Sequence, residues 1–379
     1  MKGLLACLAL VLLGCGEADK PKPKNQPKQG TPGAPGAVAR PPAPVSPKDK
    51  LQAEVIEMLR KEAILIKQKL AVLEQPGVWK HVNVSRQAQS SAERKSTDEA
   101  HTYWLLGGKC LVTEIHELEP DAETYQLMLR TYDARNEKYR MFFYMRPGHG
   151  QVFSGKWDAA AKAMTWTLDF ESPNTRGGVA EVVIVEKIKL PSRKVMDFTV
   201  TAQGKQMASG SSECTLDKDG KAPAPPKGPA EKLGMLGDGG EWLETQTLEE
   251  TGGKPETVKT VSQFRWVAGG NFLLIDGKTE VAGYTEHSLG VKSFDASTQT
   301  YGYATIWDAG YVDFYRGKWD PGAEKMTWNS ELLSSFPEGV SVGIHETLPS
   351  DKQRHWMFEV IQGRKLLLLG HGQGKHSGK

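Results

Sequence analysis

The side chains whose chemistry could support catalysis or metal binding are few and scattered in this chain. The sequence contains no Gly-x-Ser-x-Gly nucleophile motif, no His-Glu-x-x-His zinc motif and no phosphate-binding loop. Of the nine histidines, His149 is the strongest candidate ligand, because it lies in a Pro-Gly-His-Gly loop beside a predicted strand. A loop histidine is usually solvated, so we expect no catalytic residue, no metal and no cofactor, and we expect the protein not to be an enzyme.

Cysteine is the second reactive residue type, and two of the four cysteines belong to a targeting segment. Lys2 precedes an apolar run over residues 4–13, which is shorter than the roughly 20 residues that span a bilayer and predicts a signal peptide over residues 1–14. The run ends in Leu-Leu-Gly-Cys, which resembles the bacterial lipobox and implies a lipid anchor on Cys15. The alternative is a plain secretory signal. Gly16, where enteric retention signals have aspartate, favours the outer over the inner membrane of the cell envelope.

The other two cysteines, Cys110 and Cys214, remain in the folded part of the chain. An exported compartment permits them to form a disulfide. Neither cysteine is matched in the second half of the chain, and no Cys-x-x-Cys motif occurs, so a metal site built on thiolates is not expected. The pair is therefore a candidate disulfide that would be an optional addition to the fold.

The elements that would position any site begin after a segment that cannot fold. Residues 15–48 are rich in Pro, Lys, Gly and Ala and are predicted to form the lipid anchor and a semi-extended tether. Residues 18–50 carry a net charge of +5, whereas the whole chain carries +2, so residues 51–379 are net negative at −3 (2 − 5), which argues against nucleic acid as a partner. From Asp49 to Leu73 the apolar residues fall at helical spacing and predict an amphipathic helix that packs against the first domain.

An internal repeat decides the predicted architecture. The sequence Trp-Leu-Leu-Gly-Gly at Trp104 recurs as Trp-Val-Ala-Gly-Gly at Trp266, 162 residues later, and a Gly-Lys-Trp-Asp block recurs at the same offset. A Gly-x-Trp motif recurs at an offset of 163. We predict that the shared glycines lie at bends of strands and that the shared aspartates begin turns. We predict that the tryptophans of the Gly-x-Trp motif close one end of each domain. The motif residues are Trp79, Gly107, Gly108, Trp157 and Asp158 in the first copy, and Trp242, Gly269, Gly270, Trp319 and Asp320 in the second.

Within each copy the apolar residues alternate with period two, as in Met164, Trp166, Leu168 and Phe170, which indicates strands with unlike faces. About ten strands per copy follow one another at hairpin spacing without intervening helices, which favours an all-β fold of two tandem antiparallel up-and-down barrels. The alternative is a β-sandwich. The predicted ranges are 49–217 for the helix and first barrel, 218–231 for a linker, 232–370 for the second barrel and 371–379 for a disordered tail.

The order of these motifs resembles a known superfamily. A helical stretch, a Gly-x-Trp that opens the first strand and a meander of hairpins are similar to the calycins, which include the lipocalins and the fatty-acid-binding proteins. The series Trp…Gly-Gly, Tyr-Asp and Gly-x-Trp-Asp more closely resembles a bacterial lipocalin-like domain family of unknown function, over roughly residues 70–217 and 233–370. The resemblance implies barrels with an internal cavity for small apolar molecules and does not imply an activity.

One strand in each copy is the predicted pocket wall, because alternate residues place large side chains on a single face. The candidate ligand-pocket residues are Tyr139, Met141, Phe143 and Met145 in the first copy, and Tyr301, Tyr303 and Trp307 in the second. The alternative is that these side chains only fill the core. We therefore expect a lipid-anchored envelope protein that binds an apolar small molecule or lipid in one or both barrels. The alternatives are a scaffold that contacts another protein and, more remotely, a haem-binding barrel.

Overall fold

The fold is described from a computed structural model that covers residues 47–378, apart from residues 74, 89–91, 120–121, 146–148, 172–179, 225, 227, 252–254, 282–283, 297, 334 and 351. The predicted signal peptide, Cys15 and the predicted tether up to residue 46 lie outside the described residues. Helix α2 (Pro47–Leu70) begins two residues before the predicted start and ends three before the predicted end. In the part of the chain that is described, no helix is both long enough and apolar enough to span a membrane.

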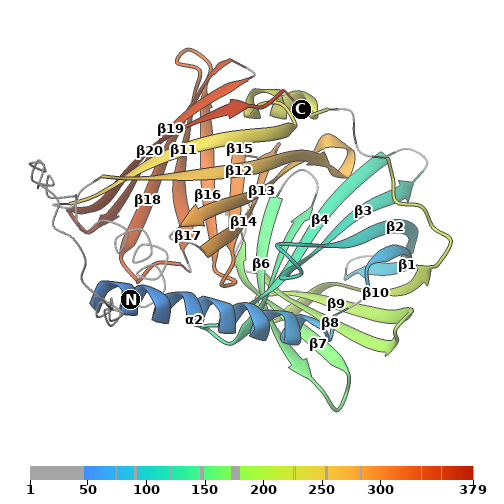
Figure 1. Cartoon of the computed structure of the whole chain (residues 1–379). Helices are drawn as coiled ribbons and strands as arrows, with labels where there is room; N and C mark the ends of the chain where they lie inside the picture. The colour runs from blue at the N-terminus through green and yellow to red at the C-terminus, as the bar shows by residue number, and fades with distance from the viewer. Residues whose placement is uncertain are drawn as a thin grey trace, which may run out of the picture.

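The first copy of the repeat forms a closed barrel of ten antiparallel strands, in which each strand pairs with its neighbours in sequence (Figure 1). Pairing between the first and last strands closes the sheet, with Trp79 opposite Leu216. The strands are β1 (Gly77–Gln87), β2 (Glu93–Leu105), β3 (Cys110–Glu119), β4 (Ala122–Asp133), β5 (Lys138–Met145), β6 (His149–Asp158), β7 (Ala163–Glu171), β8 (Ala180–Leu190), β9 (Arg193–Ala202) and β10 (Lys205–Asp217).

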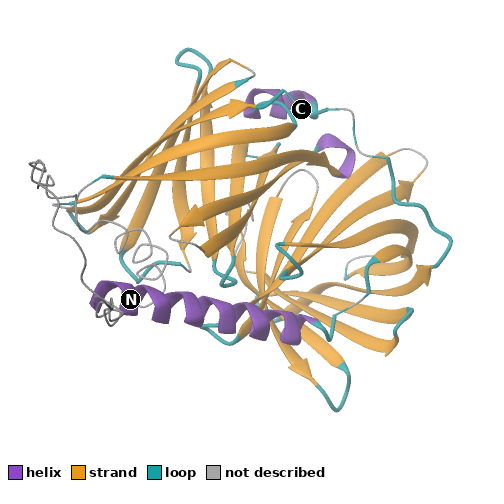
Figure 2. Ribbon diagram, viewed as in Figure 1, coloured by secondary structure: helices purple, strands orange, loops and turns teal. Residues whose placement is uncertain are grey.

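The second copy repeats this topology in a second closed barrel of ten strands (Figure 2). Its strands are β11 (Gly240–Glu250), β12 (Glu256–Val267), β13 (Phe272–Val281), β14 (Tyr284–Asp295), β15 (Thr300–Trp307), β16 (Val312–Asp320), β17 (Lys325–Leu333), β18 (Val340–Ser350), β19 (Gln353–Gln362) and β20 (Lys365–His376). Two short 3-10 helices accompany it, η1 (Glu231–Leu236) before β11 and η2 (Ala268–Gly270) after β12. The prediction of tandem up-and-down barrels is confirmed, and the β-sandwich alternative is wrong because each sheet closes on itself.

The C-terminal boundary of the second barrel differs from the prediction. Residues 371–376, predicted as part of a disordered tail, belong to β20, which pairs with both β11 and β19. The glycines there leave room for bulky neighbours: a Cβ on Gly370 would lie 2.1 Å from the Phe358 ring, and a Cβ on Gly372 would lie 2.1 Å from the Trp356 ring. The glycines thus admit aromatic side chains of β19, and they do not mark a loose end of the chain.

The aspartates shared by the two copies begin turns. The Asp158 carboxylate accepts hydrogen bonds from the backbone N–H groups of Ala160 and Ala161, at 2.9 and 3.0 Å. Asp320 accepts from Gly322 and Ala323 in the same way, at 2.9 and 3.2 Å. These bonds explain why the two aspartates recur, since an aspartate at the first turn position satisfies backbone donors that the turn leaves free.

The two barrels pack side by side through the outer faces of their walls. A buried apolar cluster combines side chains from β3 to β6 with side chains from β12 to β16, and the Tyr144 and Phe272 rings meet in it with centroids 5.6 Å apart. A buried ion pair between Lys109 and Asp308 crosses the same interface, and the Tyr284 hydroxyl donates to Asp308 at 2.7 Å. The tandem is therefore one packed unit.

Helix α2 contacts both barrels, whereas the sequence predicted contact with the first alone. Ile66 and Leu70 belong to the core cluster of the first barrel, and Leu59 belongs to that of the second. Figure 1 shows the helix running from the second barrel to the first. Glu62 on the helix pairs at 3.4 Å with Arg135, whose guanidinium lies 4.3 Å from the centre of the Tyr311 ring in the second barrel.

The candidate disulfide between Cys110 and Cys214 does not form, and both cysteines are buried thiols. Cys214 lies opposite His81 on β1, which lies opposite Asp98 on β2, which lies opposite Glu117 on β3. Cys110 lies seven residues further along β3, which is roughly 23 Å of extended strand. Cys110 also points outwards into the interface between the barrels, whereas Cys214 lies in the core of the first barrel. Disulfide geometry requires Cα atoms within about 7 Å.

Candidate functional site

The second barrel contains an internal cavity of about 320 Å³. Its aliphatic wall is formed by Leu248, Val258, Ile275, Val342, Ile344, Val360 and Leu368. Aromatic side chains are the other main component, namely Tyr303, Trp307, Tyr311, Tyr315, Trp328, Phe336, Trp356 and Phe358. Polar groups are interspersed among them, and two of these, the Thr305 and Tyr311 hydroxyls, are buried and have no hydrogen-bond partner among the described residues.

The predicted pocket residues of the second copy divide between this cavity and the closed end of the barrel. Tyr303 and Trp307 line the cavity. Tyr301 lies outside the lining, and its hydroxyl contacts the sulfur of Met235 in η1 at 3.3 Å. The closed end also contains Trp242, which is fully buried and donates its indole N–H to the Asp238 carbonyl at 3.2 Å.

The predicted pocket residues of the first copy lie in the core of their own barrel. Met141 and Phe143 belong to its apolar cluster, and the Tyr139 hydroxyl donates to the Lys69 carbonyl at the end of α2, at 3.0 Å. The side chains of Met145 and His149 lie outside the described residues. Trp79 repeats the arrangement of Trp242, since its indole N–H donates to the Gln75 carbonyl at 3.0 Å. The repeated Gly-x-Trp motif thus fixes the segment that enters each barrel.

A buried network of charged side chains forms part of the cavity wall. The sequence analysis did not predict this network. The Glu346 carboxylate accepts from Lys292 Nζ at 2.7 Å and from the Trp328 indole N–H at 3.2 Å. Its other oxygen lies 3.3 Å from Arg354 Nη2. Arg354 Nε is also 3.5 Å from Glu244, which accepts a short hydrogen bond from a serine hydroxyl of β12. Four charged side chains therefore meet inside a largely apolar barrel.

The electrostatics of this network follow from burial and from the mutual attraction of its members. Burial alone would raise the pKa of Glu346, but Lys292 and Arg354 outweigh it and hold the pKa at about 2. Burial lowers the pKa of Lys292, and Glu346 opposes that change. Burial also raises the pKa of Tyr303 and of Tyr315 well above the usual range, so both phenols stay protonated at physiological pH.

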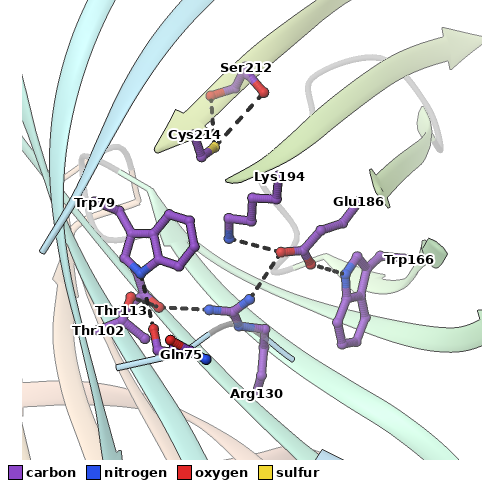
Figure 3. A network of polar contacts seen from close by, with 10 residues as sticks. All are labelled: Gln75, Trp79, Thr102, Thr113, Arg130, Trp166, Glu186, Lys194, Ser212 and Cys214. Carbon is purple, nitrogen blue, oxygen red and sulfur yellow. Dashed lines mark hydrogen bonds and ion pairs between the residues drawn. The ribbon is translucent and has the colours of Figure 1, made fainter. Parts of the chain in front are cut away.

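The first barrel contains an equivalent network (Figure 3). Glu186 accepts from Lys194 Nζ at 2.8 Å, from Arg130 Nη1 at 3.4 Å and from the Trp166 indole N–H at 3.3 Å. Arg130 also donates to the Thr113 hydroxyl at 2.7 Å. Figure 3 shows these side chains converging from separate strands. Each barrel therefore buries one glutamate between two cations, with a tryptophan N–H on the carboxylate.

The two networks are related by the repeat, and the cations are exchanged. Arg130 corresponds to Lys292 on β4 and β14, 162 residues apart. The glutamate and the second cation of each network lie after the connection between β7 and β8 or its counterpart between β17 and β18. The connection in the first barrel is two residues longer. Glu186 therefore corresponds to Glu346 and Lys194 to Arg354 at an offset of 160. This correspondence is not visible at the constant offset of 162, because the shorter loop in the second copy reduces the offset to 160.

The interiors of the barrels differ in what surrounds the network. At equivalent positions, the first barrel has Met141 where the second has Tyr303, and Phe143 where the second has Thr305. Phe143 is larger than Thr305, and both Met141 and Phe143 belong to the first barrel's core cluster. His81 occupies the position that corresponds to Glu244, as the pairing of β1 with β10 and of β11 with β20 shows. The fourth charge and the exchange of two apolar side chains for hydroxyl-bearing ones thus distinguish the interior of the second barrel.

The fold and the cavity define a tandem of closed ten-stranded barrels in which the second encloses a ligand-sized space. Residues 232–363, which make up most of the second barrel, match the model of DUF1579, a family described as a protein of unknown function. No curated protein matches the chain.

Several solved structures are similar to this chain at low sequence identity. One is a protein of unknown function from Nostoc punctiforme, of the DUF3598 family, with 10% identity over 80% of this chain and 96% of that chain and a TM-score of 0.24. Another is the S-type phycobiliprotein lyase CPES from Guillardia theta, with 8% identity over 36% of this chain and 87% of that chain and a TM-score of 0.23. A third is transferrin binding protein B from Haemophilus parasuis, with 8% identity over 80% and 76% and a TM-score of 0.19.

Proposed function

We propose that the protein binds an apolar small molecule or lipid in its second barrel, and that Cys15 anchors it in the bacterial cell envelope. The observation that carries the first part is the cavity of about 320 Å³, which is large enough for a small ligand because binding sites typically enclose about 300–1,000 Å³. Apolar and aromatic side chains dominate its wall, and the Thr305 and Tyr311 hydroxyls have no partner among the described residues. In a largely apolar pocket, a small number of polar groups fixes the orientation of a ligand.

The proposal is tested by binding of Nile red, an uncharged fluorescent probe, to the protein without its lipid. The native protein is expected to bind the dye with a blue-shifted emission. Thr305→Phe copies the residue of the first barrel at this position and is expected to weaken binding at least tenfold, because the ring enters the cavity. The control is Thr257→Phe on the exposed face of β12. Absence of dye binding to the native protein, or equal losses in both variants, would contradict the proposal and favour a scaffold role.

The anchor rests on the Leu-Leu-Gly-Cys sequence after the apolar run and has its own test. Expressed in a bacterium that processes lipoproteins, the native chain is expected in the membrane fraction, and Cys15→Ser in the soluble fraction. The expected result depends on the thioether-linked lipid, because a signal peptide alone leaves no membrane attachment after cleavage. A Cys15→Ser protein that stays with the membrane would contradict the anchor and leave the cavity proposal untouched.

A further inference from the structure

Arg354, one of the two cationic side chains that line the cavity of the second barrel, has an unused hydrogen-bond donor. The Arg354 guanidinium lies between two rings, with its central carbon 5.2 Å from the centre of Phe264 and 4.8 Å from that of Trp356. Its contacts with Glu346 and Glu244, at 3.3 and 3.5 Å, are ion pairs longer than a good charged hydrogen bond. Nη1 has no hydrogen-bond partner among the described residues, although a guanidinium offers five N–H donors.

The charges around this donor set are balanced. Lys292 and Arg354 supply two positive charges, and Glu244 and Glu346 supply two negative charges. The remaining charged side chains of the cavity wall are Asp313 and Glu286, so the lining contains twice as many carboxylates as cations. A carboxylate ligand would therefore enter a low-dielectric space with no unmatched cation to receive it, and burial of such a charge is unfavourable.

The equivalent network in the first barrel lacks a counterpart of Glu244. There Arg130 and Lys194 both pair with Glu186, and His81 stands where the second barrel has Glu244. The same barrel architecture thus accommodates the network without a carboxylate at that position. In the second barrel, Glu244 adds a second carboxylate beside Arg354, whose Nη1 has no hydrogen-bond partner among the described residues.

We infer that the second barrel takes an uncharged apolar molecule that carries a hydrogen-bond acceptor, such as an ester, ketone or amide oxygen, and that it discriminates against the corresponding carboxylate. The acceptor oxygen receives the free N–H of Arg354, and the aliphatic and aromatic wall covers the rest of the molecule. Glu244 is the specificity-determining residue, because it cancels the charge that would otherwise attract an anion. This inference rests on the proposed function and adds the chemical class of the ligand.

The test uses three ligands with the same twelve-carbon chain, which displace Nile red from the full chain without its lipid at pH 8. They are methyl dodecanoate, dodecanoate and dodecylamine. Methyl dodecanoate is expected to displace the dye at a concentration at least tenfold lower than either charged analogue. Tighter binding of dodecanoate or of dodecylamine would overturn the inference. Failure of Nile red itself to bind would overturn the proposed function as well, so the two failures are distinguishable.

Two variants identify the residues responsible. Glu244→Gln keeps the shape of the side chain and leaves the network with one excess cation, so the preference for the ester over the acid is expected to fall at least tenfold. Arg354→Lys keeps the charge and removes Nη1, so ester binding is expected to weaken. The matched control is Glu249→Gln, an exposed glutamate on the same strand. An ester-to-acid ratio that is unchanged in Glu244→Gln would overturn the assignment.

Discussion

Replacement of Glu346 by glutamine is the perturbation that most directly tests the buried network. Glutamine keeps the size of the side chain but removes the negative charge that holds two buried cations, Lys292 and Arg354, at 2.7 and 3.3 Å. Breaking a buried ion pair by removal of one partner costs about 3–5 kcal/mol, because the remaining charge stays desolvated without compensation. We therefore expect a large loss of stability, although the substitution only replaces one carboxylate oxygen by an amide NH2 group.

The shift in the pKa of Glu346 gives a second route to the same magnitude. The ordinary value is 4.5 and the value in the folded protein is about 2, a difference that corresponds to about 3 kcal/mol in favour of the ionised folded state. Because the pKa is lower in the folded state, this contribution is complete above pH 4.5. It is lost as the pH falls towards 2, where the folded protein also takes up the proton.

The assay is urea unfolding followed by tryptophan fluorescence at pH 7 and at several pH values down to 3. At pH 7, Glu346→Gln is expected to lower the free energy of unfolding by about 3 kcal/mol, which is a shift of roughly 1 M in the urea midpoint for a slope near 3 kcal/mol/M. The difference from the native protein is expected to shrink as the pH falls below 4.5. The control is Glu338→Gln, in an exposed turn. A loss below 1 kcal/mol at pH 7, or one that does not change with pH, would refute the reasoning.

Two further predictions concern the barrel interface and the cysteines. Gly310 has a φ of +78° and a Cβ there would lie 2.1 Å from the Tyr132 carbonyl oxygen, whereas Gly339 has a φ of +79° and open space. Both alanine variants incur the strain of a left-handed backbone conformation. In urea unfolding, Gly310→Ala is expected to lower the free energy of unfolding by about 2 kcal/mol more than Gly339→Ala. Equal losses in the two variants would show that the contact with the Tyr132 carbonyl is relieved. Dithiothreitol is expected to leave Tm unchanged, and a thiol reagent should modify Cys110 and Cys214 only after denaturation, because both are buried thiols outside any disulfide. A lower Tm under reduction would indicate a disulfide.

The candidate site was only partly predictable, and the reason is geometric. Tyr303 and Trp307 were identified because alternate residues of a strand share a face, and both line the cavity. The same rule selected Tyr301, which lies nearer the end of the strand and reaches η1 at the closed end. Periodicity gives the face on which a side chain lies, but it does not give the depth within the barrel.

The charged network escaped sequence reasoning for a different reason. Glu186 and Lys194 look like ordinary charged residues within apolar strands, and the shorter loop in the second copy displaces Glu346 and Arg354 by two positions from the offset of the other motifs. Their partners come from β4 and β14, far away in the chain. Only closure of each sheet brings these strands together across the barrel interior.

The fold class can be predicted from the amino-acid sequence alone, because a period of two, hairpin spacing and a duplicated set of glycines, tryptophans and aspartates are local signals. The packing of the closed sheets accounts for the remaining features. It placed Cys110 and Cys214 on opposite sides of the wall, drew a glycine-rich segment into β20, and packed the barrels through Lys109 and Asp308. These outcomes depend on which surfaces meet after the sheets close, and no local pattern in the chain records that.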